Sequence, residues 1–404
     1  MDRQILYWTM SLFGTAIGAG ILFLPITIGV GGVLSLVIML FLAYPLIHYA
    51  HKLFSQYIYA SPNINNFAQA VDDDFGKKLA LFLTFSYFIE IFVVLLLYSV
   101  ALTNSVELAL KSNFNFELNR VLLSFIIVTI LMLILSRGIN FVIKVISYFV
   151  FIFIISILLL SFYMILHWDG GIFNEFNISQ IKVGDISLAI IYAIPIMIFA
   201  FNHVAILSSM VIEQKKANKS LAEENINKIL KYAHILIIVV VLFFVFSCSM
   251  SFTIEDFKEA NSKNINILSY ISSKEGGAVL HIFAPILAII AISKSFLGHY
   301  MGAKEGFIGV IKNFKATQNI STETLNKFTF VFVALSSFLV AVLNPSVLDM
   351  INKIIAPLIA ITLFLFPVYA VRRLEKMRKY RSITNYLVLI IGIFALLVIV
   401  YELL

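Results

Sequence analysis

Two ionisable side chains lie far inside apolar stretches of the sequence. Lys294 stands in "AISKSFLGHY", about ten residues before the end of its apolar run, which is about 15 Å along a helix. A charged lysine near the centre of a bilayer costs at least about 2.5–3.5 kcal/mol, so it must be paired or periodically neutral. Because buried lysines titrate readily, Lys294 suits a proton carrier or a fixed cation that replaces Na⁺. The alternative is a structural ion pair.

Glu90, in "FSYFIEIFVV", is the only acidic residue at a similar depth in an apolar run. Ionisable groups at bilayer depth are costly and usually functional. We expect Glu90 either to pair with Lys294 or to act as a second proton site. Ser295, beside Lys294, either lines the same site or packs against its neighbours.

The stretch "GTAIGAGILFLP", residues 14–25, places three glycines and a proline inside another apolar run. Each glycine disfavours a helix interior by about 1 kcal/mol relative to alanine, and proline does so by about 3 kcal/mol. An unwound segment would free backbone N–H and C=O groups for a carboxylate and an amine. The alternative is close packing of two continuous helices through Gly14-x-x-x-Gly18. The predicted ligand-binding residues are Thr15, Ala16, Gly18 and Gly20, although Thr15 could instead bond back to its own helix.

A second candidate break is "YAIPIMIFAFNHVAILSS", in which Pro195 precedes Asn202 and His203. A lone histidine in an interior is often simply hydrogen-bonded, but adjacent polar groups at bilayer depth usually have a function. We expect Asn202 or His203 to face a ligand. Phe199 either packs or caps the ligand as a gate.

These residues must be positioned by membrane-spanning helices. The chain of 404 residues is 61% hydrophobic and 13% charged, with a mean hydropathy of +0.99, which is typical of an integral membrane protein. Continuous apolar runs of about 20 residues can cross a hydrocarbon layer of about 30 Å. The sequence predicts eleven such spans, at 5–28, 33–59, 79–110, 120–136, 141–166, 186–212, 229–252, 279–303, 326–343, 347–371 and 383–403.

The positions of the charges predict how these spans are oriented. Lysine and arginine gather between alternate spans, for example in "RRLEKMRKYR" after the tenth span. By the positive-inside rule, the N-terminus is then cytoplasmic and, after eleven crossings, the C-terminus is periplasmic or extracellular. The first run is too long and too rich in glycine for a signal peptide. The single Cys248 cannot form an intrachain disulfide.

The two interrupted runs stand five spans apart, which suggests two halves of five helices. Because five is odd, the halves cross the membrane in opposite directions. We expect one membrane domain over 1–404, with repeat one at about 5–166, repeat two at about 186–371 and an extra helix at about 383–403. Broken helices in corresponding positions are typical of the midplane binding site of a transporter.

Four stretches carry a family resemblance: "GTAIGAGILFLPI" followed by "GVGG", "IPIMIFAFNHVAILSS", "SKSFLGHYMGAKEGF" and "LNPSVLDMINKIIAPLIAITLFLFPVYA". In this order, over most of the chain, they resemble the hydroxy and aromatic amino acid permeases of the amino acid-polyamine-organocation superfamily. The serine/threonine transporter branch is the most similar. The resemblance implies a LeuT-type five-plus-five inverted repeat with broken helices 1 and 6. It also implies proton-coupled uptake across the bacterial inner membrane. Glu90 is not carried over, because the family's pattern is uncharged there.

The expected function is import of a small hydroxy amino acid, most of all L-serine and then L-threonine, by a proton symporter. The alternatives are an aromatic amino acid permease of the same fold and coupling to Na⁺ instead of H⁺. We expect no cofactor, no metal, no nucleic acid and no obligate protein partner. No nucleophile–base pair, metal-ligand spacing or phosphate loop is visible in the sequence, which argues against an enzyme, and a channel would not need two broken helices.

Overall fold

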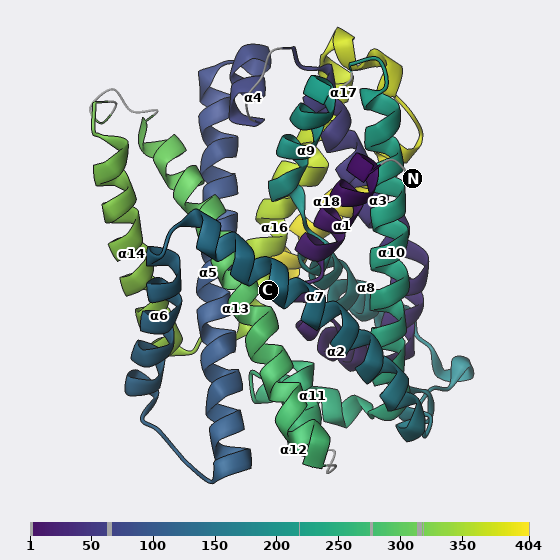
Figure 1. The fold of residues 1–404 in the computed structure, drawn as a ribbon. Coiled ribbons are helices and arrows are strands. Elements are labelled where there is room, and N and C mark those ends of the chain that lie inside the picture. Colours follow the sequence, from purple (N-terminus) through teal and green to yellow (C-terminus); the bar gives the residue numbers. More distant parts are fainter. Residues whose placement is uncertain are drawn as a thin grey trace.

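The computed structural model describes residues 3–62, 67–217, 219–274, 278–312, 317 and 319–403. Within these ranges all regular secondary structure is helical (Figure 1). The long helices are α1 (Arg3–Ala16), α2 (Gly20–Val30), α3 (Gly32–Ala60), α5 (Lys77–Phe114), α6 (Arg120–Ser136), α7 (Ile139–Met164), α8 (Val183–Ala200), α9 (Val204–Ala217), α10 (Ala222–Ser251), α13 (Ala278–Lys312), α14 (Thr322–Leu343) and α18 (Thr384–Leu403).

Shorter helices connect or extend these long ones. They are α4 (Phe67–Phe75), α11 (Ile254–Ser262), α12 (Ile267–Lys274), α15 (Val347–Met350), α16 (Ala356–Ile359) and α17 (Phe366–Arg373), with 3₁₀ turns η1 (Ile165–His167), η2 (Gly171–Phe173), η3 (Ile178–Gln180) and η6 (Glu375–Tyr380). Two π-helical segments, η4 (Ile351–Ile355) and η5 (Ala360–Leu365), join α15, α16 and α17 into one long apolar element.

Helices occupy every range in which the sequence predicts a span. Among the described residues, eight helices are long and apolar enough to cross a membrane, and the bent pair α1–α2 adds a ninth. Two further apolar helices, α6 and the described part of α18, are shorter. The protein is therefore an all-helical, multi-pass membrane protein, while the count of eleven crossings and the inverted repeat stay predictions.

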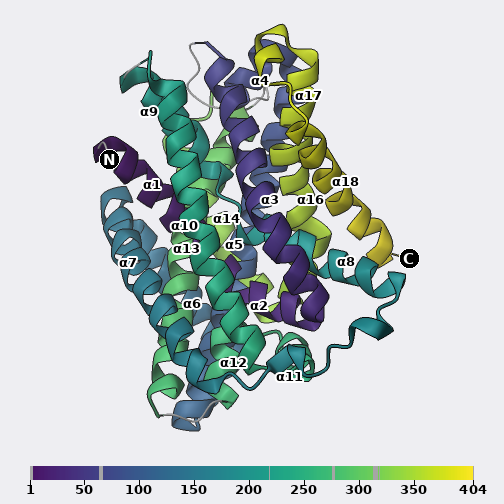
Figure 2. The same ribbon diagram turned by 90° about the vertical axis from the view of Figure 1, so that its right-hand side faces the viewer.

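The bundle places α5 and α13 side by side through its middle (Figure 1). The helices α4 and α17 lie at one end of the bundle, together with the end of α9, and α11 and α12 lie at the other end (Figure 2). These are the segments that the charge distribution assigns to the inner and outer sides respectively.

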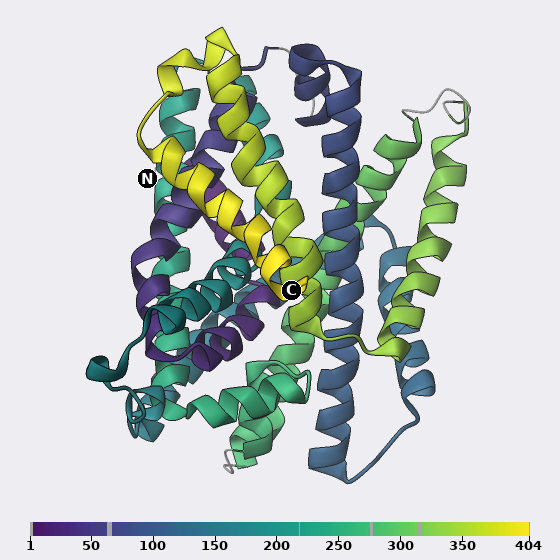
Figure 3. The same ribbon diagram turned by 180° about the vertical axis from the view of Figure 1, so that it is seen from behind.

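The helix α14 stands at the edge of the bundle (Figure 3) and presents two different faces. Its face toward the bundle buries small or polar residues, including Thr329, Ser337 and Ala341, while Phe328 and Leu335 on the opposite face are more than half exposed. A water-soluble protein would show the reverse pattern. The exposed face of α14 suits contact with lipid.

At the predicted outer end, α11 and α12 are held together by a polar cluster. Asp256 caps α11 with Thr253, and it also accepts hydrogen bonds from Tyr270 and from the ammonium of Lys274. Partial burial by itself would raise the pKa of Asp256, but these hydrogen bonds outweigh it and lower the pKa to about 2. Asp256 therefore stays ionised at any physiological pH.

Candidate functional site

The first helix break lies at Ile17–Ala19, where α1 and α2 meet at an angle of 56°. Its glycines allow other helices to come very close. A Cβ on Gly18 would lie 2.7 Å from Ser295 Oγ, and a Cβ on Gly20 would lie 3.1 Å from the Cα of Ala200. The glycines therefore bring this break directly against α13 and α8.

Gly14 has a different part in this stretch. It lies within α1, and a Cβ there would meet Val150 Cγ1 of α7 at 2.8 Å. The close-packing alternative thus applies to Gly14, whereas Gly18 lies in an interrupted helix. From the sequence, an unwound segment and close helix packing were considered as alternatives. The structure contains both.

Lys294 of α13 directs its ammonium into the first break. Its Nζ donates to the carbonyl of Gly14 at 3.0 Å and to that of Ile17 at 2.5 Å, and only 4% of the residue is exposed. The ring of Phe153 on α7 lies 5.9 Å from Nζ. Both acceptors lie at the end of α1, where the helix dipole is negative. These contacts are to carbonyls, so the expected ion pair of Lys294 with a carboxylate is not what holds it.

Ser295, the next residue, contacts the same break. Its Oγ accepts a hydrogen bond from the N–H of Ala19 at 3.0 Å, and its carbonyl accepts one from His299 Nδ1 at 2.8 Å. Adjacent residues of α13 therefore hold both kinds of freed backbone group, the N–H through Ser295 and the C=O through Lys294. Ser295 and Lys294 thus contact the same break, and a part for Ser295 in proton coupling stays a prediction.

The second break lies at Phe201–His203, between α8 and α9. Pro195 does not cause it directly, because α8 continues through Pro195 and ends at Ala200. Asn202 bridges the break: its Oδ1 accepts from the N–H of Val204 at 3.1 Å, and its Nδ2 donates to Glu90 Oε1 at 2.8 Å. The side chain of Asn202 thus links the break to α5.

Glu90 does not pair with Lys294. Its other oxygen, Oε2, lies 3.2 Å from Thr362 Oγ1, in the π-helical segment η5. That hydroxyl is also 3.1 Å from the carbonyl of Leu358. When Glu90 is charged, the hydroxyl of Thr362 can donate its hydrogen to the carboxylate. When Glu90 is protonated, the same hydroxyl can donate to the carbonyl of Leu358 and accept the hydrogen of Glu90. The network accommodates both protonation states, as a proton site requires.

A small cavity lies between the two breaks. It is lined by Thr15, Ala16, Gly18, Gly20, Val94, Tyr98, Phe199, Ala200, Asn202, Ser295 and His299. Six of the seven predicted ligand-binding residues line it, and so does Ser295. Residues from the two halves of the sequence therefore meet at one place.

The cavity is narrow in this conformation. Its volume is about 30 Å³, enough for a water molecule or two but not for an amino acid. The Thr15 hydroxyl donates to the carbonyl of Ser11 at 2.8 Å, so it bonds back to its own helix here. A ligand between the breaks requires the surrounding helices to move apart.

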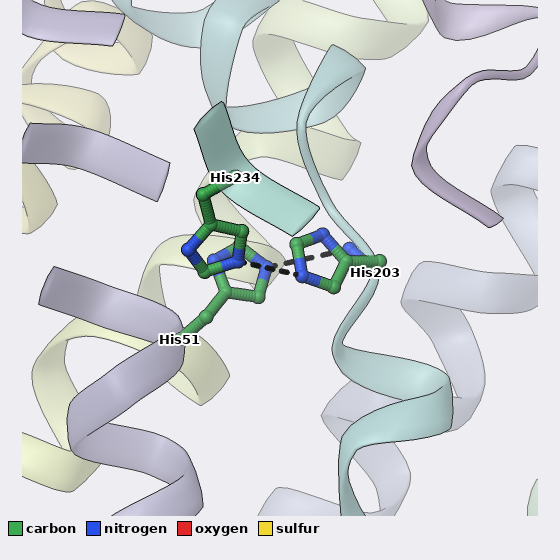
Figure 4. A group of neighbouring side chains, drawn as sticks. All are labelled: His51, His203 and His234. Carbon is green, nitrogen blue, oxygen red and sulfur yellow. Dashed lines mark hydrogen bonds between the residues drawn. The ribbon is translucent and has the colours of Figure 1, made fainter. Parts of the chain in front are cut away.

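His203 is the one predicted ligand-binding residue that does not line the cavity. Its ring packs away from it, against His51 of α3 and His234 of α10 (Figure 4). No local sequence pattern connects these residues, because 152 and 31 positions separate them from His203. Tyr98 and Thr362 were not predicted either, since a hydroxyl in an apolar run gives no periodic signal.

Comparison with known proteins gives a consistent result. A family model described as transmembrane amino acid transporter protein matches residues 3–404. The serine transporter SdaC of Escherichia coli (strain K12) is 39% identical over 403 residues, covering 98% of this chain and 94% of the relative. The threonine/serine transporter TdcC of Escherichia fergusonii is 35% identical over 418 residues, covering 98% of this chain and 94% of that relative.

Proposed function

Because the chain belongs to the family of transmembrane amino acid transporter proteins, we propose that it imports L-serine, and also L-threonine, by proton-coupled alternating access. The chain is a multi-pass membrane transporter and not an enzyme, as the sequence predicts. What we propose beyond family membership is which amino acid is transported, which ion drives the transport, and how the transport cycle proceeds.

The observation that carries the proposal is the cavity shared by the two helix breaks. Freed backbone groups at such breaks suit a zwitterionic amino acid, because N–H groups attract its carboxylate and carbonyls attract its amine. Thr15 and Ser295, which carry hydroxyl groups, line the cavity beside glycine and alanine. These small polar groups favour a hydroxy amino acid, and the names of the two relatives support the same substrate class.

The position of Lys294 supports the proposed proton coupling. Carbonyls of an unwound helix are the groups that coordinate Na⁺ in transporters with broken helices. Here the ammonium of Lys294 already occupies the carbonyls of Gly14 and Ile17, and Na⁺ would have to displace it. Glu90 supplies a second group that can gain and lose a proton, joined to the second break through Asn202. The driving force is then the proton gradient, with no cofactor.

The small volume of the cavity supports the alternating-access part of the proposal. Because the space between the breaks is too small for a substrate, it must widen before a substrate binds. We propose the bacterial inner membrane as its location, with the N-terminus in the cytoplasm and the C-terminus outside. This orientation rests on the distribution of lysine and arginine.

The test is uptake of radiolabelled L-serine by the purified protein in liposomes, driven by a proton gradient or by a Na⁺ gradient. We expect uptake with the proton gradient alone, and competition in the order L-serine, then L-threonine, then L-tryptophan. Competition by tryptophan at a lower concentration than serine would instead assign an aromatic substrate. Uptake that requires Na⁺ would contradict the proposed coupling.

A further inference from the structure

Four buried histidines meet beside the second helix break. His203 is in the break itself, His48 and His51 are on α3, and His234 is on α10. His48 is 9% exposed, and the other three are at most 1% exposed. The rings of His51, His203 and His234 gather at one place (Figure 4), and none of the four histidines lines the cavity between the breaks.

The hydrogen bonds of three of these rings form a chain with a defined direction. His203 Nδ1 lies 2.9 Å from the carbonyl of Phe201, His203 Nε2 lies 3.1 Å from His234 Nε2, and His234 Nδ1 lies 3.1 Å from His48 Nδ1. A carbonyl can only accept, so the Nδ1 of His203 carries a hydrogen and its Nε2 accepts. His234 must then donate from Nε2 and accept at Nδ1, and His48 must donate from Nδ1. The free lone pair is left at His48 Nε2.

His51 lies in the cluster but outside the chain. Its Nδ1 donates to the carbonyl of Ile47 at 2.7 Å, and its Nε2 faces the N–H of His203 at 3.4 Å. Its ring stacks on that of His203, with centroids 3.8 Å apart. His51 therefore shares the burial and packing of the others without linking to His234 by a hydrogen bond.

The open end of the chain points toward the predicted inner interface. His48 is one helical turn, about 6 Å, from Lys52 on α3, and His234 is three residues from Lys231 on α10. The ammonium groups of Lys52 and Lys231 are the charges that act on His48, and the rings of Tyr44 and Tyr49 contact it. Lysines at this depth extend their side chains to the membrane surface. His48 is therefore the end of the chain nearest to water.

We propose that His48, His234 and His203 form a proton relay that joins the inner interface to the second helix break. A proton binds to His48 Nε2, the Nδ1–H of His48 passes to His234 Nδ1, and the Nε2–H of His234 passes to His203 Nε2. His203 then carries the positive charge, and the other two rings are neutral with their hydrogens exchanged. The reverse sequence returns the proton to the inside and restores the original hydrogen bonds. The role in transport rests on the proposed proton coupling.

The geometry also explains why this relay serves one side of the membrane at a time. While His234 donates to His203 Nε2, that nitrogen is blocked to any other proton donor. Only movement of the second break, which separates the two rings, lets His203 exchange a proton elsewhere. A transporter that couples a proton to substrate needs this restriction, because free exchange with both sides would dissipate the gradient.

A metal ion is the competing occupant of this cluster. One nitrogen from each of His51, His203 and His234 lies within 4.8 Å of the others. An ion bound at about 2.0–2.1 Å by the lone pair of an imidazole lies in the plane of that ring. The rings of His51 and His203 are stacked with only 6° between their planes, so one ion cannot lie in both planes. The hydrogen-bonded chain, in contrast, needs no rearrangement.

The experiment compares His234→Gln with His51→Gln in the purified full-length protein in liposomes. Glutamine keeps a polar amide in the cluster but cannot relay a proton, and His51 supplies a matched buried control outside the chain. The first readout is L-serine accumulation driven by a proton gradient. We expect at least a tenfold loss for His234→Gln, while serine counterflow, which needs no net proton movement, stays within about twofold. His51→Gln retains both activities.

The second readout is the dependence of counterflow on internal pH, which tests the relay even if the driving ion proves to be Na⁺. We expect the wild type and His51→Gln to respond to internal pH and His234→Gln to lose the response. Equal thermal stability of the variants excludes misfolding. Wild-type accumulation of serine by His234→Gln, or an equal loss of accumulation in both variants, would overturn the relay. The same internal-pH profile of counterflow in all three proteins would also overturn it, as would one tightly bound Zn²⁺ per chain that uptake requires.

Discussion

In transporters with broken helices, the carbonyls at a break bind a mobile cation. In this protein the ammonium of Lys294 lies at that position. This ammonium reaches the carbonyls of Gly14 and Ile17, so protonation of one residue controls the charge at the first break. Lys294→Ala should keep serine counterflow, but its serine accumulation driven by a proton gradient should fall at least tenfold. Lys294→Arg should fail as well, because a guanidinium does not release its proton. Both variants are measured in the same liposome assay, and accumulation by Lys294→Ala at the wild-type level would contradict the role.

A second residue-scale prediction concerns Gly18. A Cβ added at Gly18 would lie only 2.7 Å from Ser295 Oγ. The larger side chain in Gly18→Leu must therefore displace Ser295 or fill the cavity. We expect serine uptake to fall by at least 100-fold while the protein still inserts into the membrane. Gly184→Leu is the matched control, since a Cβ on Gly184 meets nothing within 4 Å. Normal uptake by Gly18→Leu would show that the ligand does not bind at the first break.

At the scale of elements, the pair α11–α12 gives a prediction about pH. The pKa of Asp256 is about 2, below the ordinary 3.8. Ionised Asp256 therefore stabilises these helices fully above about pH 4, and this contribution is lost as the pH falls toward 2. Limited digestion with pepsin should begin to cut α11 only near the lower end of this window.

The variant Asp256→Asn removes the charge at every pH, so pepsin should cut α11 at least threefold faster than in the wild type already at pH 4. The matched control is Glu255→Gln on the same helix, because the side chain of Glu255 is 74% exposed and pairs with exposed Lys258. Identical digestion of wild type and Asp256→Asn across this range would mean that Asp256 does not hold α11 and α12 together.

The sequence predicted the elements of the site better than their contacts. Glycine spacing located the first break to within a few residues, because the helix penalty of glycine is local. Asn202 and His203 marked the second break correctly, while Pro195 in the same stretch stays inside α8, since surrounding helices can hold a proline within a continuous helix. The partners of Glu90 are Asn202 and Thr362, 112 and 272 positions away. Such contacts depend on how the helices pack, and no local pattern encodes them.

For the whole molecule, the predicted orientation can be tested by cysteine labelling. The sequence has one cysteine, Cys248, and it is buried in α10, so the wild type provides an unlabelled background. Lys263→Cys, at the predicted outer end, should react with a membrane-impermeant maleimide in intact cells. Lys327→Cys, at the predicted inner end, should react only after the membrane is permeabilised. The side chains of both lysines are more than half exposed, and the opposite labelling pattern would reverse the topology.

The central claim is that each serine enters together with a proton, and the most direct measurement is the internal pH of liposomes during serine uptake. The purified protein is placed in Na⁺-free liposomes that contain a pH-sensitive dye, with no imposed pH gradient and the membrane potential clamped by K⁺ and valinomycin. External L-serine should acidify the interior of liposomes with the wild type, and it should not do so with Lys294→Ala. Serine entry without a change of internal pH, or entry only when Na⁺ is added, would contradict the account.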